Sequence, residues 1–176
     1  LIKASEEKEW DKSIVHAELM RKEDDKSSYD RLNLLVDSSG WNKVAAAVGE
    51  NIAELAATLP REFTEWLLTK TEEENWDKEK VYSKMIMVND EGKTALAHFA
   101  ESNLWNKIAA VVGVKVADAA TAMPRKFFEW LLTKTEEENW DKTTVHNGLC
   151  QPNKEGKTAI SRLDLAMPMW TRLSMW

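Results

Sequence analysis

The sequence contains few of the residues that mark several common classes of protein. Cys150 is the only cysteine among the 176 residues, which excludes a disulfide scaffold and favours a reducing compartment, so we expect a cytoplasmic location. The net charge is -6 and the pI is near 5.2, and this acidic balance disfavours a nucleic-acid partner. The most apolar stretch, residues 108–123, is interrupted by Lys115 and Asp118, so we expect no transmembrane helix.

Residues suited to metal binding and catalysis are also scarce. The histidines, too few and too scattered for a zinc site, are His16, His98 and His146. His146 and Cys150 could meet on one helix face as a base and a nucleophile, but no third orienting group or oxyanion motif accompanies them. The acidic runs at 72–74 and 136–138 lack the glycine turn of a hard-cation loop. We therefore expect no catalytic residue, metal site, cofactor or small-molecule substrate.

What the sequence does contain is a long internal duplication. Residues 61–78 return at 125–142, a spacing of 64 residues, with sixteen of eighteen positions identical. The match continues upstream, where SSGWNKVAAAVG at 38–49 pairs with SNLWNKIAAVVG at 102–113. Such a duplication is typical of a repeat protein. It predicts a single helical-repeat domain over 1–176, with a partial N-terminal repeat at 1–40, repeats at 41–104 and 105–168, and the end of the array at 169–176.

Hydrophobic spacing predicts helices throughout. Phe63, Trp66 and Leu67 lie three and four residues apart, which makes one apolar stripe on a helix that Pro60 opens. Alanine-rich helices are expected at 51–59 and 115–123, and no segment alternates as a strand would. The predicted fold class is all-α, specifically an α-solenoid of stacked helical hairpins built from 64-residue repeats.

Several residues predict where these helices begin and end. Gly49 and Gly113 are expected to be C-caps of the helices before them. Thr71 and Glu74 have the spacing of a capping box, so we expect the helix that carries Trp76 to start at Thr71. Thr135 and Glu138 have the same spacing 64 residues later, so we expect the helix that carries Trp140 to start at Thr135.

The segment 89–112, NDEGKTALAHFAESNLWNKIAAVV, resembles the ankyrin repeat. It has a polar D-x-G-x-T turn, a short helix beginning T-x-L, and a second helix of I-x-x-V type, and residues 153–166 repeat its first half. Ala95 stands where the family has proline, Ala97 where it has histidine, and the unit of 64 residues is longer than the family's, about 33. A separate helical repeat that converged on the same turn chemistry is the alternative. Divergent ankyrin-like arrays occur in proteins that intracellular bacteria secrete, so the resemblance also implies an effector acting in the host cytosol.

The tryptophans admit two interpretations. Six of the nine lie in similar W-x-K or W-x-R settings: Trp10, Trp41, Trp76, Trp105, Trp140 and Trp170. They could form a ladder of aromatic anchors for a partner. Alternatively, each could fill the seam between stacked units and donate its indole N–H to a loop carbonyl. Their repeat periodicity favours the second interpretation, under which Trp140→Ala would cost about 3–5 kcal/mol.

The two glycine-containing polar turns are the predicted partner surface. Loop residues can vary for binding because they do not hold the core. The predicted partner-binding residues are Asn89, Asp90, Glu91, Lys93, Asn153, Lys154, Glu155 and Lys157. Simple solvated turns are the competing interpretation. The function expected is a protein–protein interaction scaffold that binds through these turns and a concave face, without catalysis.

Two other functions remain open on the sequence. Leu1 in place of methionine indicates a piece of a longer protein, so the chain could be an accessory or substrate-recognition segment of a larger enzyme or secreted effector. The Trp-rich amphipathic helices could bind a membrane surface, but such helices usually carry a basic polar face and this chain is acidic. We therefore expect a protein partner rather than a membrane.

Overall fold

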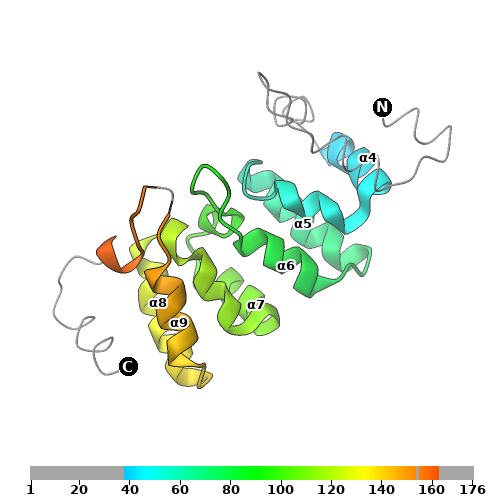
Figure 1. Cartoon of the computed structure of the whole chain (residues 1–176). Coiled ribbons are helices and arrows are strands. Elements are labelled where there is room, and N and C mark those ends of the chain that lie inside the picture. The colour runs from blue at the N-terminus through cyan, green and yellow to red at the C-terminus, as the bar shows by residue number, and fades with distance from the viewer. Residues whose placement is uncertain (1–37, 154, 163–176) are drawn as a thin grey trace. The chain divides into compact units, whose positions relative to one another are not determined.

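The computed structural model describes residues 38–153 and 155–162, and these residues are all-helical (Figure 1). The prediction of an all-α fold is confirmed. Two compact units divide the chain between Val81 and Tyr82, and this boundary falls inside helix α6, Lys78–Ile86. Most of the predicted repeat at 1–40 and the whole of 169–176 lie outside the described residues, as do Trp10, His16 and Trp170.

The first unit places three helical segments ahead of α6. These are α4 at Ser38–Val48, the 3₁₀-helix η1 at Gly49–Leu55, and α5 at Arg61–Glu73. Helix α4 packs against both η1 and α5. Phe63 and Leu67, from the predicted apolar stripe of α5, are fully buried. The stripe therefore forms the face that α5 turns toward the core.

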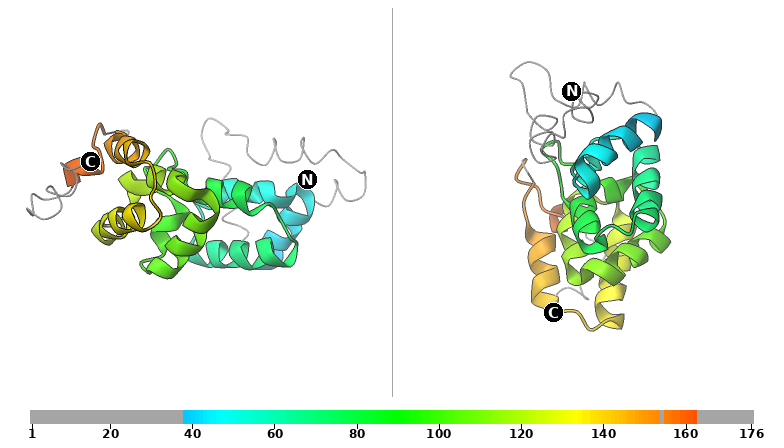
Figure 2. Two further views of the ribbon diagram at one scale, coloured as in Figure 1. Left: turned by 90° about the horizontal axis from the view of Figure 1, so that it is seen from below. Right: turned by 90° about the vertical axis from the view of Figure 1, so that its right-hand side faces the viewer.

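In the second unit, helices α7 to α9 pack around a central 3₁₀-helix. The segments are η2 at Ala95–His98, α7 at Ser102–Val112, η3 at Gly113–Ala122, α8 at Arg125–Glu137, α9 at Lys142–Cys150 and η4 at Ile160–Arg162. Segment η3 packs against α7, α8 and α9. Helices α8 and α9 lie side by side and are joined at one end (Figure 1, Figure 2).

Close packing of α9 on η3 depends on residues without large side chains. A Cβ atom added at Gly148 would lie 3.0 Å from both the Cβ and the carbonyl oxygen of Ala117. Ala117 is itself buried. The position equivalent to Gly148 in the first copy is Lys84, so the second copy alone has the pair of small residues that this approach requires.

The alanine-rich segments differ from the ordinary helices expected at 51–59 and 115–123. The observed segments are the 3₁₀-helices η1 and η3, and each begins at a glycine with positive φ, 61° at Gly49 and 60° at Gly113. Gly113 is the C-cap of α7, as predicted. A left-handed residue ends an α-helix and redirects the chain, so the next segment starts afresh with a tighter hydrogen-bonding pattern.

The capping box predicted at Thr71 and Glu74 is wrong. Thr71 lies in the last turn of α5, and its buried hydroxyl donates to the Leu67 carbonyl at 2.7 Å. The helix then closes at Asn75, whose φ is 52°, and the Trp76 N–H donates to the Thr71 carbonyl. A left-handed asparagine is a common residue just beyond a helix C-terminus. The second copy does the same at Asn139, where φ is 51°.

Helices α6 and α9 begin further along the chain than the capping boxes predicted, and an aspartate precedes each of them. The Asp141 side chain accepts from the Thr144 N–H and caps α9. Asp77 holds the equivalent place before α6, where its carboxylate accepts from the N–H groups of Glu79 and Lys80. The Thr144 hydroxyl and N–H together lower the pKa of Asp141. The WDK motif is therefore the true helix start, with aspartate as the N-cap.

Candidate functional site

The first predicted turn, residues 89–93, is organised around one side chain. The Asn89 Oδ1 atom accepts from the N–H groups of Glu91 and Lys93, both at 2.9 Å. The Asn89 N–H donates to the Lys93 carbonyl at 2.8 Å, and the Gly92 N–H donates to the Asn89 carbonyl at 3.0 Å. Gly92 supplies the positive φ, 75°, that closes the loop. The turn thus satisfies its own backbone.

The second predicted turn, residues 153–157, repeats this arrangement. Asn153 Oδ1 accepts from the N–H groups of Glu155 and Lys157 at 3.0 and 2.9 Å. The Asn153 N–H again donates to the carbonyl at the far end of the turn, and Gly156 has a φ of 74°. Lys154 lies outside the described residues. Two segments far apart in the chain therefore adopt one backbone conformation.

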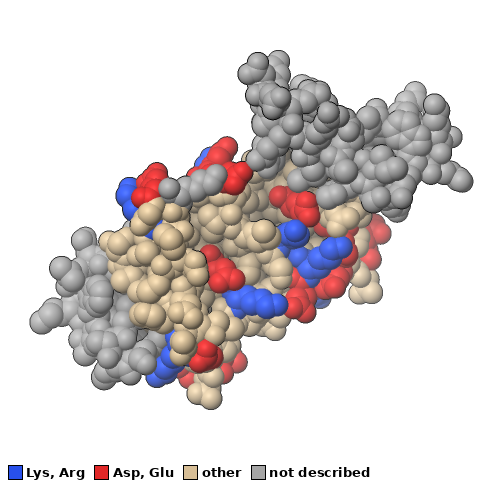
Figure 3. Space-filling view, in the orientation of Figure 1, with Lys and Arg blue, Asp and Glu red and all other residues tan. Residues whose placement is uncertain are grey.

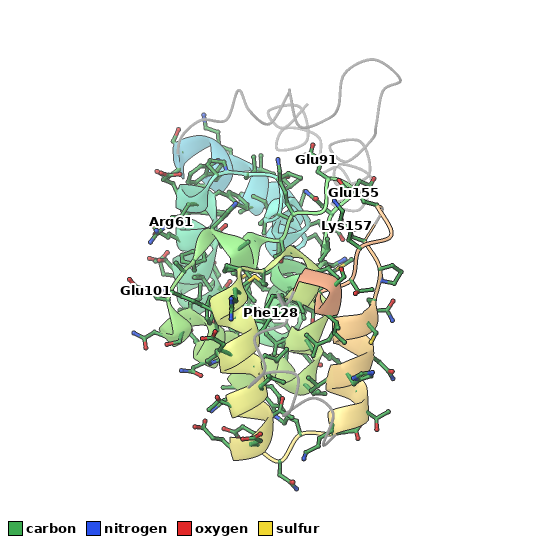
Figure 4. All side chains as sticks on the ribbon, turned by 90° about the vertical axis from the view of Figure 1, so that its left-hand side faces the viewer. Arg61, Glu91, Glu101, Phe128, Glu155 and Lys157 are labelled. Atoms are coloured by element: carbon green, nitrogen blue, oxygen red, sulfur yellow. The ribbon has the colours of Figure 1, made fainter. Side chains whose placement is uncertain are left out.

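Each turn displays the same ion pair. Lys93 Nζ lies 2.8 Å from Glu91 Oε2, and Lys157 Nζ lies 2.8 Å from Glu155 Oε2, with all four side chains about two-thirds exposed. The Lys157 ammonium lowers the pKa of Glu155. Glu91, Glu155 and Lys157 lie near one another at one end of the second unit (Figure 4).

The two asparagines also have a structural role within their own turns. Asn89 and Asn153 are predicted to contact a partner, and their side-chain oxygens accept hydrogen bonds within their own turns. The side chains that the turns present outward are the Glu–Lys pairs and Asp90, all exposed. On the face shown in Figure 3, acidic and basic side chains intermix over the described part of the chain.

The foot of the first turn is tied to α6 by a buried threonine. Thr94 is 1% exposed, and its hydroxyl donates to the Met85 carbonyl at 2.8 Å. The Oγ1 atom of its equivalent, the half-buried Thr158, instead accepts from the Ser161 N–H, close to the start of η4. Met87, just before the first turn, is 54% exposed.

The tryptophans divide into two classes. Trp41 and Trp105 are buried, and each forms a cluster with a phenylalanine and a second tryptophan of its own copy: Trp41 with Phe63 and Trp66, Trp105 with Phe127 and Trp130. The edge-to-face contacts between Trp and Phe have centroid distances of 5.3 and 5.2 Å. As expected, the Trp105 indole N–H donates to a loop carbonyl, that of Phe99, at 3.1 Å.

Trp76 and Trp140 do not fit the same prediction. Both are half-buried, because each follows a left-handed asparagine that carries the chain out of its helix. We expected Trp140 to fill a packed seam, but it stands on the wall of a hollow of about 330 Å³. The other lining residues are Asn106, Ala109, Ala110, Gly113, Lys134 and Glu138. All seven have identical counterparts 64 residues earlier.

Two charged residues line this hollow, and they are paired. Lys134 Nζ lies 2.7 Å from Glu138 Oε1 and 3.7 Å from Glu137 Oε2. The hydrogen bond to Glu138 raises the pKa of Lys134. The Asn106 side-chain oxygen accepts from the Trp130 indole N–H at 2.9 Å. The amide is therefore held in place beside the hollow.

In the first copy, the Glu50 side chain links the start of η1 to the start of α6. Glu50 Oε2 accepts from the Asp77 N–H at 3.1 Å, and Glu50 Oε1 pairs with Lys80 Nζ at 2.7 Å. The hydrogen bond from Lys80 lowers the pKa of Glu50, against the effect of partial burial. The sequence patterns did not predict this bridge. The available signal was that positions 50 and 80 change together between the copies, from Glu and Lys to Val114 and Thr144.

His146 and Cys150 do come together, as their spacing suggested. The Cys150 Sγ atom lies 3.4 Å from His146 Nε2, and both side chains are exposed on α9. Within 38–153 and 155–162, no group of three or more His, Cys, Asp or Glu side chains could hold a metal ion. None of the helices described is both long and apolar enough to cross a membrane.

Comparisons of the chain with protein-family models, with curated proteins and with solved structures found no match.

Proposed function

We propose that this chain is a non-catalytic protein-interaction module that binds a protein partner through the turns at 89–93 and 153–157. The observation that carries the proposal is the identity of the two turns. Each uses one asparagine to satisfy the loop backbone, and each presents a Glu–Lys pair to solvent. Because the backbone of each turn is already fixed by hydrogen bonds, binding through its exposed side chains would cost little main-chain conformational entropy.

The repeat architecture proposed is an ankyrin-like α-solenoid of 64-residue units. The duplicated sequence supports it, and so do the matched Trp–Phe–Trp clusters and the matched helix ends at Asn75 and Asn139. In such an array the turns project beside the helices, where a partner can reach them. We propose the cytoplasm as the compartment, because the single thiol, Cys150, is free and exposed.

Reversal of the turn charges tests this function. In the test variant, Glu91 and Glu155 become lysine, and Lys93 and Lys157 become glutamate. The control reverses Arg125 and Glu129, a similarly exposed pair on α8 whose nearest atoms lie 3.6 Å apart. Both variants keep the composition and the net charge of the parent, so a difference in binding reports the location of the charges, and circular dichroism checks that both remain folded.

The measurement is affinity capture from cell lysate with the parent and both variants, followed by a binding titration with each captured protein. We expect the turn variant to weaken binding by at least about tenfold, because misplaced charges in an interface are costly. The control should bind as the parent does. A partner that binds all three proteins equally would place its contact elsewhere and refute the role of the turns.

A further inference from the structure

Helix α9 carries two metal-ligating side chains at positions that are buried in α6. His146 and Cys150 lie 64 residues after Tyr82 and Ile86, which are 0% and 3% exposed. In α9 both side chains are exposed. The second copy therefore places an imidazole and a thiol together on its surface, one helical turn apart, where they reach the same patch.

The two side chains have the separation of neighbouring ligands on one metal ion. Cys150 Sγ lies 3.4 Å from His146 Nε2. In a tetrahedral zinc site, Zn–S bonds of about 2.3 Å and Zn–N bonds of about 2.0–2.1 Å place the sulfur and the nitrogen about 3.5–3.6 Å apart. A zinc ion can therefore bind both atoms while the backbone of α9 keeps its conformation.

This pair is half of a tetrahedral ligand set. Among the residues that the structure describes, no group of three or more His, Cys, Asp or Glu side chains could hold a metal ion. Two further ligands must therefore come from elsewhere. The same pair from a second copy completes a Cys₂His₂ set, which is common in structural zinc sites. A two-fold symmetric dimer forms this set from one kind of contact.

The surface around the pair permits the approach of a second copy. Its neighbours on the same face of α9 are Thr143 and Asn147, whose side chains are short, exposed and uncharged. With His146 and Cys150 they lie three and four residues apart and so form one stripe. Lys142 is the only charged residue of α9. Two such faces therefore meet with little electrostatic repulsion.

We propose that His146 and Cys150 bind a zinc ion together with the same two residues of a second copy, so that zinc joins two chains into a dimer. Each chain contributes one imidazole nitrogen and one thiolate sulfur, and the two thiols release two protons for each ion bound. The two thiolates neutralise the charge of the ion, and zinc keeps its oxidation state.

The proposal differs from the sequence-based expectation of no metal site because the number of ligands is doubled. One cysteine in a chain excludes a thiolate-rich zinc site within that chain, whereas a dimer has two cysteines. The dimer does not depend on the turns at 89–93 and 153–157, so it goes beyond the proposed function.

The experiment adds zinc chloride to the metal-free, reduced full chain and measures its mass by sedimentation velocity. We expect zinc to double the mass at a ratio of one ion to two chains, and EDTA to reverse the change. Cobalt(II), which takes similar nitrogen and sulfur ligands, then serves as a spectroscopic probe of thiolate coordination.

Variants at exposed positions of α9 identify the ligands. Cys150→Ser and His146→Asn should each weaken zinc-dependent dimerisation by at least about tenfold, because each dimer loses two of its four bonds to the ion. Cys150→His keeps a ligand at this place, so it should still dimerise with zinc but should lose the thiolate absorption of the cobalt form. Asn147→Ala is the matched control and should behave as the parent. Circular dichroism checks that each variant is folded.

Several results would overturn the proposal. These are a mass that excess zinc does not change, or a zinc response that Cys150→Ser and His146→Asn both retain. A dimer that persists in EDTA would have another cause, such as a disulfide, and zinc bound by a single chain would place the remaining ligands within that chain. The charge-reversed turn variant should dimerise with zinc as the parent does, so this inference and the proposed function can fail separately.

Discussion

At the scale of single residues, Glu50 links the start of η1 to the start of α6 with one carboxylate. Its pKa is lowered in the folded chain, mainly by the hydrogen bond from Lys80. A group whose pKa is lower in the folded state than in the unfolded state stabilises the fold above its unfolded pKa. That stabilisation is lost as the pH falls through its folded pKa.

We therefore predict that Glu50→Gln is less stable than the parent at neutral pH and equally stable in acid. The expected loss at pH 7 is about 0.5–1 kcal/mol, because the pair is partly exposed, and it should disappear as the pH falls through the lowered pKa of Glu50, well below the ordinary glutamate pKa of about 4.3. Urea unfolding at the two pH values measures it. Glu62→Gln, at an exposed position of α5, is the matched control and should show little effect at either pH. A loss of stability that persists in acid would show that the substitution acts through packing and not through the charge of Glu50.

Tyr82 carries a polar group that the described residues leave unsatisfied. Its side chain is 0% exposed, and its hydroxyl has no hydrogen-bond partner among them. A buried unpaired hydroxyl costs about 1–3 kcal/mol. We predict that Tyr82→Phe raises the free energy of unfolding by about 1 kcal/mol, measured by chemical denaturation. A decrease in stability would instead indicate a hydrogen bond to a part of the chain outside those residues.

Residue identity alone could predict some of these roles. The repeat spacing favoured a buried tryptophan with its N–H on a loop carbonyl, and Trp105 has that geometry. The polar turns were located correctly, and the asparagines at their starts are predicted to contact a partner. Their Oδ1 atoms also hold the loop, because an Asx side chain can accept from N–H groups two to four residues further along the chain. Sequence does not show which of these acceptors will be engaged internally.

At the scale of elements, the two tryptophan classes should differ in energy. Trp105 is 2% exposed and packs against α8, whereas Trp140 is half-buried on the wall of the hollow. We predict that Trp105→Ala costs about 3–5 kcal/mol and Trp140→Ala about 1–2 kcal/mol. Thermal and urea unfolding of the two variants provide the comparison. Equal losses would mean that the hollow is closed in solution.

Helix boundaries were harder to predict than helix content. The T-x-x-E spacing at Thr71 matched an N-terminal motif, yet it lies at a C-terminus because Asn75 adopts a left-handed conformation just after it. The same four residues suit either end, and only the aspartate of the following WDK motif distinguishes them. The sequence also could not predict that η1 and η3 are 3₁₀-helices. Alanine favours the α-helix by intrinsic propensity, and tertiary packing can override that propensity.

At the scale of the whole molecule, each copy holds its core together with its own aromatic residues. Phe63 and Phe127 are both 0% exposed, and each contacts the two tryptophans of its own copy. A core truncation should therefore act first on the copy that contains it. The duplication predicted this correspondence, but it could not predict that the boundary between the compact units falls within α6.

We predict that Phe63→Ala and Phe127→Ala each cost about 3–5 kcal/mol and that their effects on amide exchange differ in location. Phe63→Ala should reduce protection mostly within 38–81, and Phe127→Ala mostly within 82–150. Each variant serves as the control for the other. The same pattern of lost protection in both variants would show that the copies open as one cooperative unit.

In the turn at 89–93, the residues that fix the backbone differ from those that are exposed, and this separation has an evolutionary consequence. Asn89 and Gly92 determine the loop's path, while Asp90, Glu91 and Lys93 contribute exposed side chains. Substitutions at these three exposed positions can therefore change the surface of the turn while its backbone conformation is kept. Gene duplication then doubles the number of such sites, and Val114 against Glu50 shows that duplicated cassettes of this chain have already diverged.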